Sequence, residues 1–184
     1  FGYMCASGII FGALFTFIGT SEQVFRDIFH QQDTFVLWFA GVAATLACAN
    51  FLNSRIVEKL GMRRISHTAL VVFTFMSMTL ALITYIFGES LVWFYPMFAL
   101  TFACFGLMGS NFSAMAMEPL GDIAGSASAA YGFATTTVAS LIGMAIGSTF
   151  NGSTVPIMLG FMCLGLVAMS IILITEKGRL FRSR

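Results

Sequence analysis

Charged residues are scarce in this sequence. Asp, Glu, Lys and Arg together make up 9% of its 184 residues, whereas about a quarter of the residues of an average soluble domain are charged. Hydrophobic residues make up 58%, and the mean hydropathy is +0.91. This composition excludes a soluble globular domain, and the net charge of +1 gives no reason to expect a nucleic-acid partner. It predicts an integral membrane protein whose surroundings are a lipid bilayer.

Cysteine and histidine are also few. Neither histidine, His30 or His67, falls in the middle of an apolar run. The cysteines show no metal-type or redox-type spacing, and we interpret them as small buried hydrophobic residues: Cys5, Cys48, Cys104 and Cys163. We therefore expect no metal, cofactor or disulfide.

The sequence also lacks an initial Met and a basic region before its first apolar run, so we expect a fragment that begins near the start of a helix.

Long stretches without charge predict membrane-spanning helices. About twenty apolar residues in a helix cover the roughly 30 Å hydrocarbon core of a bilayer. The spans predicted in this way are residues 1–20, 34–53, 65–87, 90–117, 120–149 and 154–175. Only helices and closed barrels satisfy their backbone in lipid, and the sequence shows no ten-residue alternation typical of a barrel. The predicted fold class is therefore all-α, with six transmembrane helices.

The charged residues mark the ends of these spans. We interpret residues 53–64 as a short loop at the membrane surface, and the polar segment around Arg26 as lying in the interface. Four Lys and Arg residues fall in the 53–64 segment and four in the tail after residue 175, against Arg26 alone on the other side. This bias predicts that both termini face the cytoplasm.

Small residues recur at intervals of four in two predicted spans. Such spacing gives a helix a flat face that a neighbouring helix can approach closely. The candidate packing residues are Gly8 and Gly12 in the first span and Gly121, Gly125, Gly132, Gly143 and Gly147 in the fifth. We expect the fifth span to be packed in a bundle or to slide against a neighbour.

Residues 54–64 resemble a loop pattern of the major facilitator superfamily, G-x-x-x-D-R-x-G-R-R, in the copy that joins the second and third helices of the carboxyl-terminal half. Glu58 takes the acidic position, Lys59 the next basic position, Gly61 the turn glycine and Arg64 a closing basic position. Ser54 replaces the first glycine and Met62 displaces one basic residue, whereas Arg55 and Arg63 add positive charge to the segment. The resemblance implies a gate element, with Glu58 directed at the positive end of a helix in the other half.

A second resemblance covers residues 117–132 and 150–156, which look like the eleventh-helix region of the Bcr/CflA-type multidrug efflux branch; residues 11–15 look like its seventh helix. Together the resemblances span the chain and imply helices seven to twelve of a twelve-helix fold, without the amino-terminal half. They imply proton-coupled export of drugs or small amphipathic molecules by alternating access at a bacterial inner membrane. The implied partners are a small-molecule substrate, protons and the other half of the protein.

Aromatic residues spaced three or four apart are candidate substrate contacts. Aromatic faces bind apolar rings and hold cations. The candidates are Phe11 and Phe15 in the first span, Tyr95, Phe98, Phe102 and Phe105 in the fourth, and Tyr131 in the fifth, whose hydroxyl needs a partner. The alternative interpretation is that these phenylalanines face lipid or neighbouring helices.

No predicted span has a carboxylate or histidine near its middle, so any essential proton carrier is predicted to lie in the other half. Glu118 and Asp122 begin the fifth span, where they cap the helix or, alternatively, form a cytoplasmic gate with Arg55 or Arg64.

An importer or exporter of a nutrient or metabolite is an alternative function, because a fold does not fix the substrate. A membrane-embedded enzyme is a remote alternative, since Ser110 has no histidine base at membrane depth.

Overall fold

The computed structural model describes residues 1–178 and 180–181, with the exception of the side chain of Asp122. The predicted basic tail residues Arg179, Arg182 and Arg184 lie outside the described residues. Every regular element in the described chain is helical. The elements are α1 (Gly2–Asp27), the short η1 (Gln32–Thr34), α2 (Phe35–Leu60), α3 (Met62–Phe87), α4 (Leu91–Met117), the short η2 (Glu118–Ile123), α5 (Ala124–Gly147) and α6 (Val155–Thr175).

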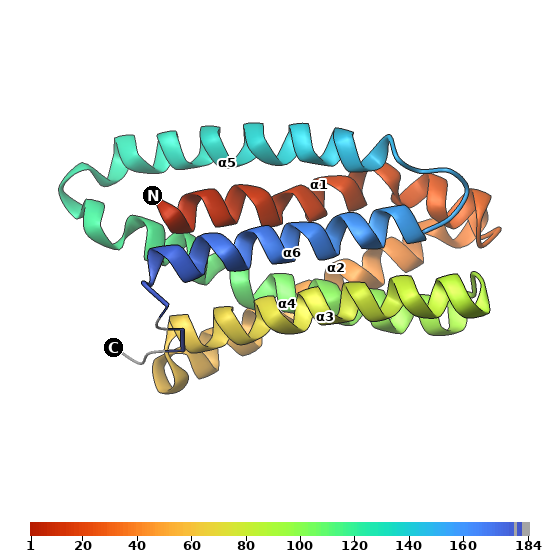
Figure 1. Ribbon diagram of the computed structural model, residues 1–184, viewed down its shortest axis with the longest axis horizontal. Helices are drawn as coiled ribbons and strands as arrows, with labels where there is room; N and C mark the ends of the chain where they lie inside the picture. Colours follow the sequence, from red (N-terminus) through yellow and green to blue (C-terminus); the bar gives the residue numbers. More distant parts are fainter. Residues whose placement is uncertain (179, 182–184) are drawn as a thin grey trace.

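Six helices of the described chain are long and apolar enough to cross a membrane. They run along the long axis of one bundle, and the N-terminus lies at the same end as the end of the described chain (Figure 1). Helix α1 packs against α4, α5 and α6, while α4 also packs against α2 and α3. The all-α fold class and the six spans predicted from the sequence are confirmed.

The predicted loop at residues 53–64 is helical except at Gly61. Helix α2 continues to Leu60 and α3 begins at Met62. Gly61 makes the turn with a φ of 82°, and its N–H donates to the carbonyl of Val57. Glycine adopts this left-handed conformation without a steric cost. The flanking Arg, Glu, Lys and Leu residues are good helix formers, so charge at the membrane surface does not end the helix.

The polar segment around Arg26, predicted to lie in the interface, also begins as a continuation of a helix. Helix α1 continues beyond residue 20 to Asp27. In its last two turns Arg26 pairs with Glu22, four residues earlier, and with Asp27. Such i, i+4 pairs stabilise a solvent-exposed helix by a few tenths of a kcal/mol. The polar residues up to Asp27 therefore extend the first helix, and those from Gln32 to Thr34 form the short η1.

Phenylalanine rings fill the centre of the bundle. Phe102 of α4 is fully buried, and its ring centroid lies 4.8 Å from that of Phe17 and 6.1 Å from that of Phe161. Phe73 of α3 and Phe94 of α4 are also buried. Because lipid tails are as apolar as these rings, their stabilising effect in a membrane comes from close packing rather than from the exclusion of water.

Candidate functional site

Helices α1 and α5 pack closely through small residues. The contacts are Gly8 with Val138, Gly12 with Ile142, Gly143 with Phe15, and Gly147 with Thr20. A Cβ on Gly143 would lie 2.8 Å from the Cβ of Phe15 and 3.1 Å from its carbonyl carbon. Four of the seven predicted packing glycines therefore lie at one helix contact. Gly121, Gly125 and Gly132 have no neighbouring atom within 4 Å of where a Cβ would lie.

A cleft of about 410 Å³ opens beside the α1–α5 contact, toward the carboxyl-terminal ends of both helices. Small-molecule sites have volumes of about 300–1,000 Å³, so the cleft is large enough for a small ligand. It is lined by the apolar side chains of Phe15 and Met144, the amide of Gln23, and the hydroxyls of Ser140 and Ser148. This mixture of apolar surface with a few polar groups suits an amphipathic molecule.

Gln23 was not singled out in the sequence. Its exposed amide makes no hydrogen bond to the described residues, which leaves it available to a ligand. Phe15, Gly19 and Gln23 follow at intervals of four, so they share one face of α1, and all three line the cleft. That spacing is the signal that could have identified Gln23.

Most of the predicted aromatic contacts lie elsewhere. Phe98, Phe102 and Phe105 of α4 are 5%, 0% and 5% exposed, inside the bundle core. Phe11 packs edge-on against Phe105, with the ring centroids 5.2 Å apart. Contact with neighbouring helices, the alternative given above, accounts for these rings in this conformation. Of the predicted substrate residues, Phe15 is the one that lines the α1–α5 cleft.

The two predicted tyrosines connect pairs of helices. The Tyr131 hydroxyl donates to the Ser7 hydroxyl at 2.8 Å and so joins α5 to α1. The Tyr95 hydroxyl donates to the Trp38 carbonyl at 3.2 Å and joins α4 to α2. The partner expected for the Tyr131 hydroxyl is thus a residue of the adjacent helix.

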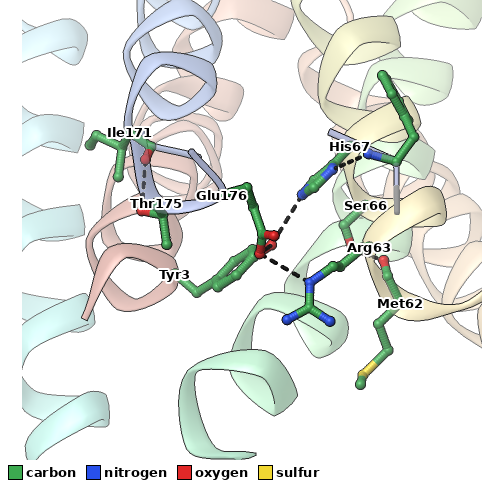
Figure 2. A network of polar contacts seen from close by, with 9 residues as sticks. Tyr3, Met62, Arg63, Ser66, His67, Ile171, Thr175 and Glu176 are labelled. Atoms are coloured by element: carbon green, nitrogen blue, oxygen red, sulfur yellow. Dashed lines mark hydrogen bonds and ion pairs between the residues drawn. The ribbon is translucent and has the colours of Figure 1, made fainter. Parts of the chain in front are cut away.

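A polar network joins α1, α3 and the residue after α6, near the first residues of α1 and α3 (Figure 2). Arg63 donates through Nε to Glu176 Oε1 at 3.0 Å, and the Tyr3 hydroxyl donates to the same oxygen at 2.8 Å. The Tyr3 oxygen lies 3.1 Å from His67 Nε2, and the Phe181 N–H donates to His67 Nδ1 at 3.2 Å. Since Nδ1 accepts and the Tyr3 proton is directed at Glu176, these contacts assign the imidazole proton to Nε2.

Glu176 is held ionised by its neighbours. Partial burial acts to raise the pKa of this carboxyl, but the hydrogen bonds from Tyr3 and Arg63, together with attraction to Arg63, outweigh burial and lower the pKa below its ordinary value. Its carboxylate therefore serves as a fixed anion that connects three helices near neutral pH.

The other residues of the predicted gate make fewer contacts. Arg55 lies with its guanidinium 5.0 Å from the centre of the Phe51 ring, one turn earlier on α2. Glu58 is exposed and forms no hydrogen bond or ion pair with another described side chain, and neither do Lys59 and Arg64. Accordingly, no ion pair between Glu118 and Arg55 or Arg64 is formed among the described side chains. The Asp122 side chain falls outside them.

A reciprocal amide pair connects α2 with α4. Asn53 donates to the Asn111 side-chain oxygen at 3.1 Å, and Asn111 donates back at 2.9 Å. Both residues are buried, whereas Asn50 is exposed. Asn50 makes no side-chain hydrogen bond to another described residue, so Asn53 is the α2 amide that joins the two helices.

Glu89, in the turn between α3 and α4, caps the start of α6. Its carboxylate accepts the Thr154 backbone N–H at 2.6 Å and the Thr154 hydroxyl at 2.9 Å. A negative charge at this position favours the positive end of the helix. Glu89 thereby fixes the turn at the end of the bundle opposite the termini.

The described residues include no group of three His, Cys, Asp or Glu side chains placed to hold a metal ion. Cys104 is buried as expected, but Cys48 and Cys163 are exposed on α2 and α6. Their interpretation as buried residues was wrong, because apolar residues of a membrane bundle also cover its outer surface.

These features define the class of the chain: it is an integral membrane protein built as a six-helix bundle. It is similar to a protein of Haemophilus influenzae named Bicyclomycin resistance protein homolog, with 30% identity over 162 residues. The matched region covers 85% of this chain but 39% of that protein, so the chain spans less than half the length of its relative. No protein-family model matches the sequence, and no solved structure matches it.

Proposed function

We propose that the chain is the carboxyl-terminal six-helix half of a major facilitator superfamily transporter that exports drugs or other small amphipathic molecules. The similarity to the Bicyclomycin resistance protein homolog, which extends over 85% of the chain, carries this proposal. The loop pattern at residues 54–64 and the six spans support it. The name of the relative makes bicyclomycin the first compound to test.

The exposure of α2 and α5 supports a protein built from two six-helix halves. In the apolar windows of α2 and α5, 11% and 17% of the residues are buried, compared with 56% in α1 and 50% in α4. In α3 and α6 the buried share is 33%. Gly125 and Gly132 lie seven residues apart on one face of α5 with open space beside them. We assign these surfaces of α2 and α5 to contact with the amino-terminal half.

The α1–α5 cleft is the proposed substrate contact of this half. Phe15 and Met144 offer apolar surface, and Gln23 offers an amide without another partner. In a rocking-halves mechanism the substrate lies between the two halves, and α5 is one of the two helices proposed to face the other half. Phe98 and Phe102 of α4 pack on Phe17 of α1, the helix that forms one wall of the cleft.

Proton coupling is assigned to the other half. Among the described residues, no carboxylate lies near the middle of a spanning helix. Glu176 lies after the last residue of α6, and its lowered pKa keeps it ionised near neutral pH. A group that carries protons needs a pKa that changes state during the cycle.

The test compares accumulation of bicyclomycin, other drugs and nutrients in cells with and without the full-length protein. Export predicts less drug in the cells that contain it. Gln23→Ala is expected to reduce export about two- to tenfold, the effect of one lost hydrogen bond, at unchanged abundance. Gln32→Ala, in the exposed η1 segment, is the matched control. Increased accumulation of a nutrient would favour an importer instead, and equal losses from both variants would exclude the cleft as the site.

A further inference from the structure

A groove separates α2 from α3 at the end of the bundle that holds the termini. The two helices follow each other directly, yet α2 packs mainly on α4, α3 packs on both α4 and α6, and the two pack little on each other. The space between them forms a cavity of about 540 Å³. Its walls are Ile56 and Leu60 of α2 and Ile65 and Val72 of α3, and its floor is Leu107 of α4.

Among the described residues, one cation lines this apolar groove. Arg64 lines it, is exposed, and forms no ion pair with a described carboxylate. Arg63, by contrast, is directed at Glu176. Glu58 is roughly 200° around α2 from the groove residue Ile56, since successive residues of a helix are about 100° apart. The charge in the groove is therefore positive and not neutralised by α2.

The start of α3 adds to this positive character. Arg64 is the third residue of α3, and no side chain caps the N–H groups of this first turn. Uncapped N–H groups and the helix dipole favour an anion, above all a phosphate. Arg64 and Val72 are eight positions apart, about 12 Å along the helix axis. The groove thus has an anion-binding end and an apolar length.

We propose that this groove binds one anionic phospholipid, with the phosphate at Arg64 and an acyl chain along Ile65, Val72 and Leu107. The six helices place the groove in contact with the bilayer, and its charged end coincides with the ends of α2 and α3, where headgroups lie. A cationic amphipathic substrate would be repelled by Arg64, so the charge selects a lipid with a negative headgroup. The bound lipid fills the space that α2 and α3 leave open.

The experiment titrates the purified full-length protein in mild detergent with phosphatidylglycerol and with phosphatidylcholine of the same acyl chains. Bound lipids are counted by native mass spectrometry. The protein is expected to bind one phosphatidylglycerol in preference to phosphatidylcholine. Arg64→Gln is expected to weaken phosphatidylglycerol binding about fivefold, the contribution of one basic residue near a membrane surface, and to weaken phosphatidylcholine binding less, because the choline cation already offsets the charge of its phosphate.

Two further variants identify the site. Arg55→Gln removes the same charge at the same end of the bundle but outside the groove, and its lipid binding should equal that of the wild type. Thr68→Trp, at an exposed position in the groove wall, should reduce the binding of both lipids. Equal losses in Arg55→Gln and Arg64→Gln would overturn the proposal in favour of a diffuse surface attraction. Unchanged binding in Thr68→Trp, or bicyclomycin displacing the lipid, would overturn it as well.

Discussion

Glu176 receives hydrogen bonds from two different helices, Tyr3 of α1 and Arg63 of α3. Glu176→Gln removes the charge and is expected to lower the unfolding free energy near pH 7 by about 1.5–3 kcal/mol, the range for hydrogen bonds to charged groups. Because folding lowers the pKa of this carboxyl, its contribution is present above the ordinary value of 4.5 and is lost as the pH falls through the folded value. The measurement is the Tm of the full-length protein against pH.

The variant should therefore start from a lower Tm at neutral pH and lose less of it in acid. Asp33→Asn is the matched control, because Asp33 of η1 is exposed and forms no ion pair with a described residue. Its Tm should follow the wild type at every pH. A Glu176→Gln curve parallel to the wild type would mean that other carboxylates cause the acid sensitivity.

Some residues of the candidate site could be predicted from the sequence and others could not, for a physical reason. Gly61 was identified as the turn residue from the local pattern, and a positive φ is a local property. The partner of Arg63 could not be identified, because Glu176 lies 113 positions away and meets it only through the packing of α3 beside α6. Phe15 could be proposed from spacing, but its cleft depends on how α1 and α5 pack against each other.

At the scale of the element, hydropathy predicted that the six helices exist and missed their ends. A charge-free window measures the part of a helix that lies in lipid. Helices α1 and α2 continue seven residues beyond the windows that ended at residues 20 and 53. Good helix formers prolong the helix into the headgroup region, and only Gly61 ends α2. Likewise, the spacing of glycines predicted close helix contact but could not tell which glycines have a partner within this bundle.

The contact between α1 and α5 leads to a prediction on Gly143. In Gly143→Ala the new Cβ meets the α1 backbone at Phe15 and Thr16, which cannot move as a flexible side chain can. We expect a loss of about 1–3 kcal/mol in unfolding free energy, the usual cost of overpacking. Gly19→Ala, in α1 with nothing within 4 Å, should instead be neutral or stabilising by up to about 1 kcal/mol through helix propensity. Chemical denaturation of both variants in detergent measures the difference.

A stabilised Gly143→Ala variant would contradict the close approach of the two helices. Equal effects of the two substitutions would show that glycine acts through helix propensity alone. The opposite signs expected for Gly143 and Gly19 thus separate packing from propensity within a single helix pair.

At the scale of the whole molecule, six helices bury the centres of α1 and α4 and leave α2 and α5 largely uncovered. Large apolar side chains remain exposed on both, including Phe51 of α2 at 63% and Phe133 of α5 at 75%. Lipid can cover apolar side chains, but it gives a glycine face such as Gly125 and Gly132 no close packing. These surfaces are therefore the place where a second six-helix unit is expected to add stability.

Expression of the chain with and without the rest of the protein tests this expectation. Alone, the chain should be several-fold less abundant in the membrane, since a stability difference of about 1–2 kcal/mol changes abundance by that much, and it should not lower drug accumulation. Supplied as two separate polypeptides, the halves should associate and restore both abundance and export. If the chain alone is abundant, forms a dimer of itself and exports the drug, then a second copy covers α2 and α5, and the proposal of two different halves is wrong.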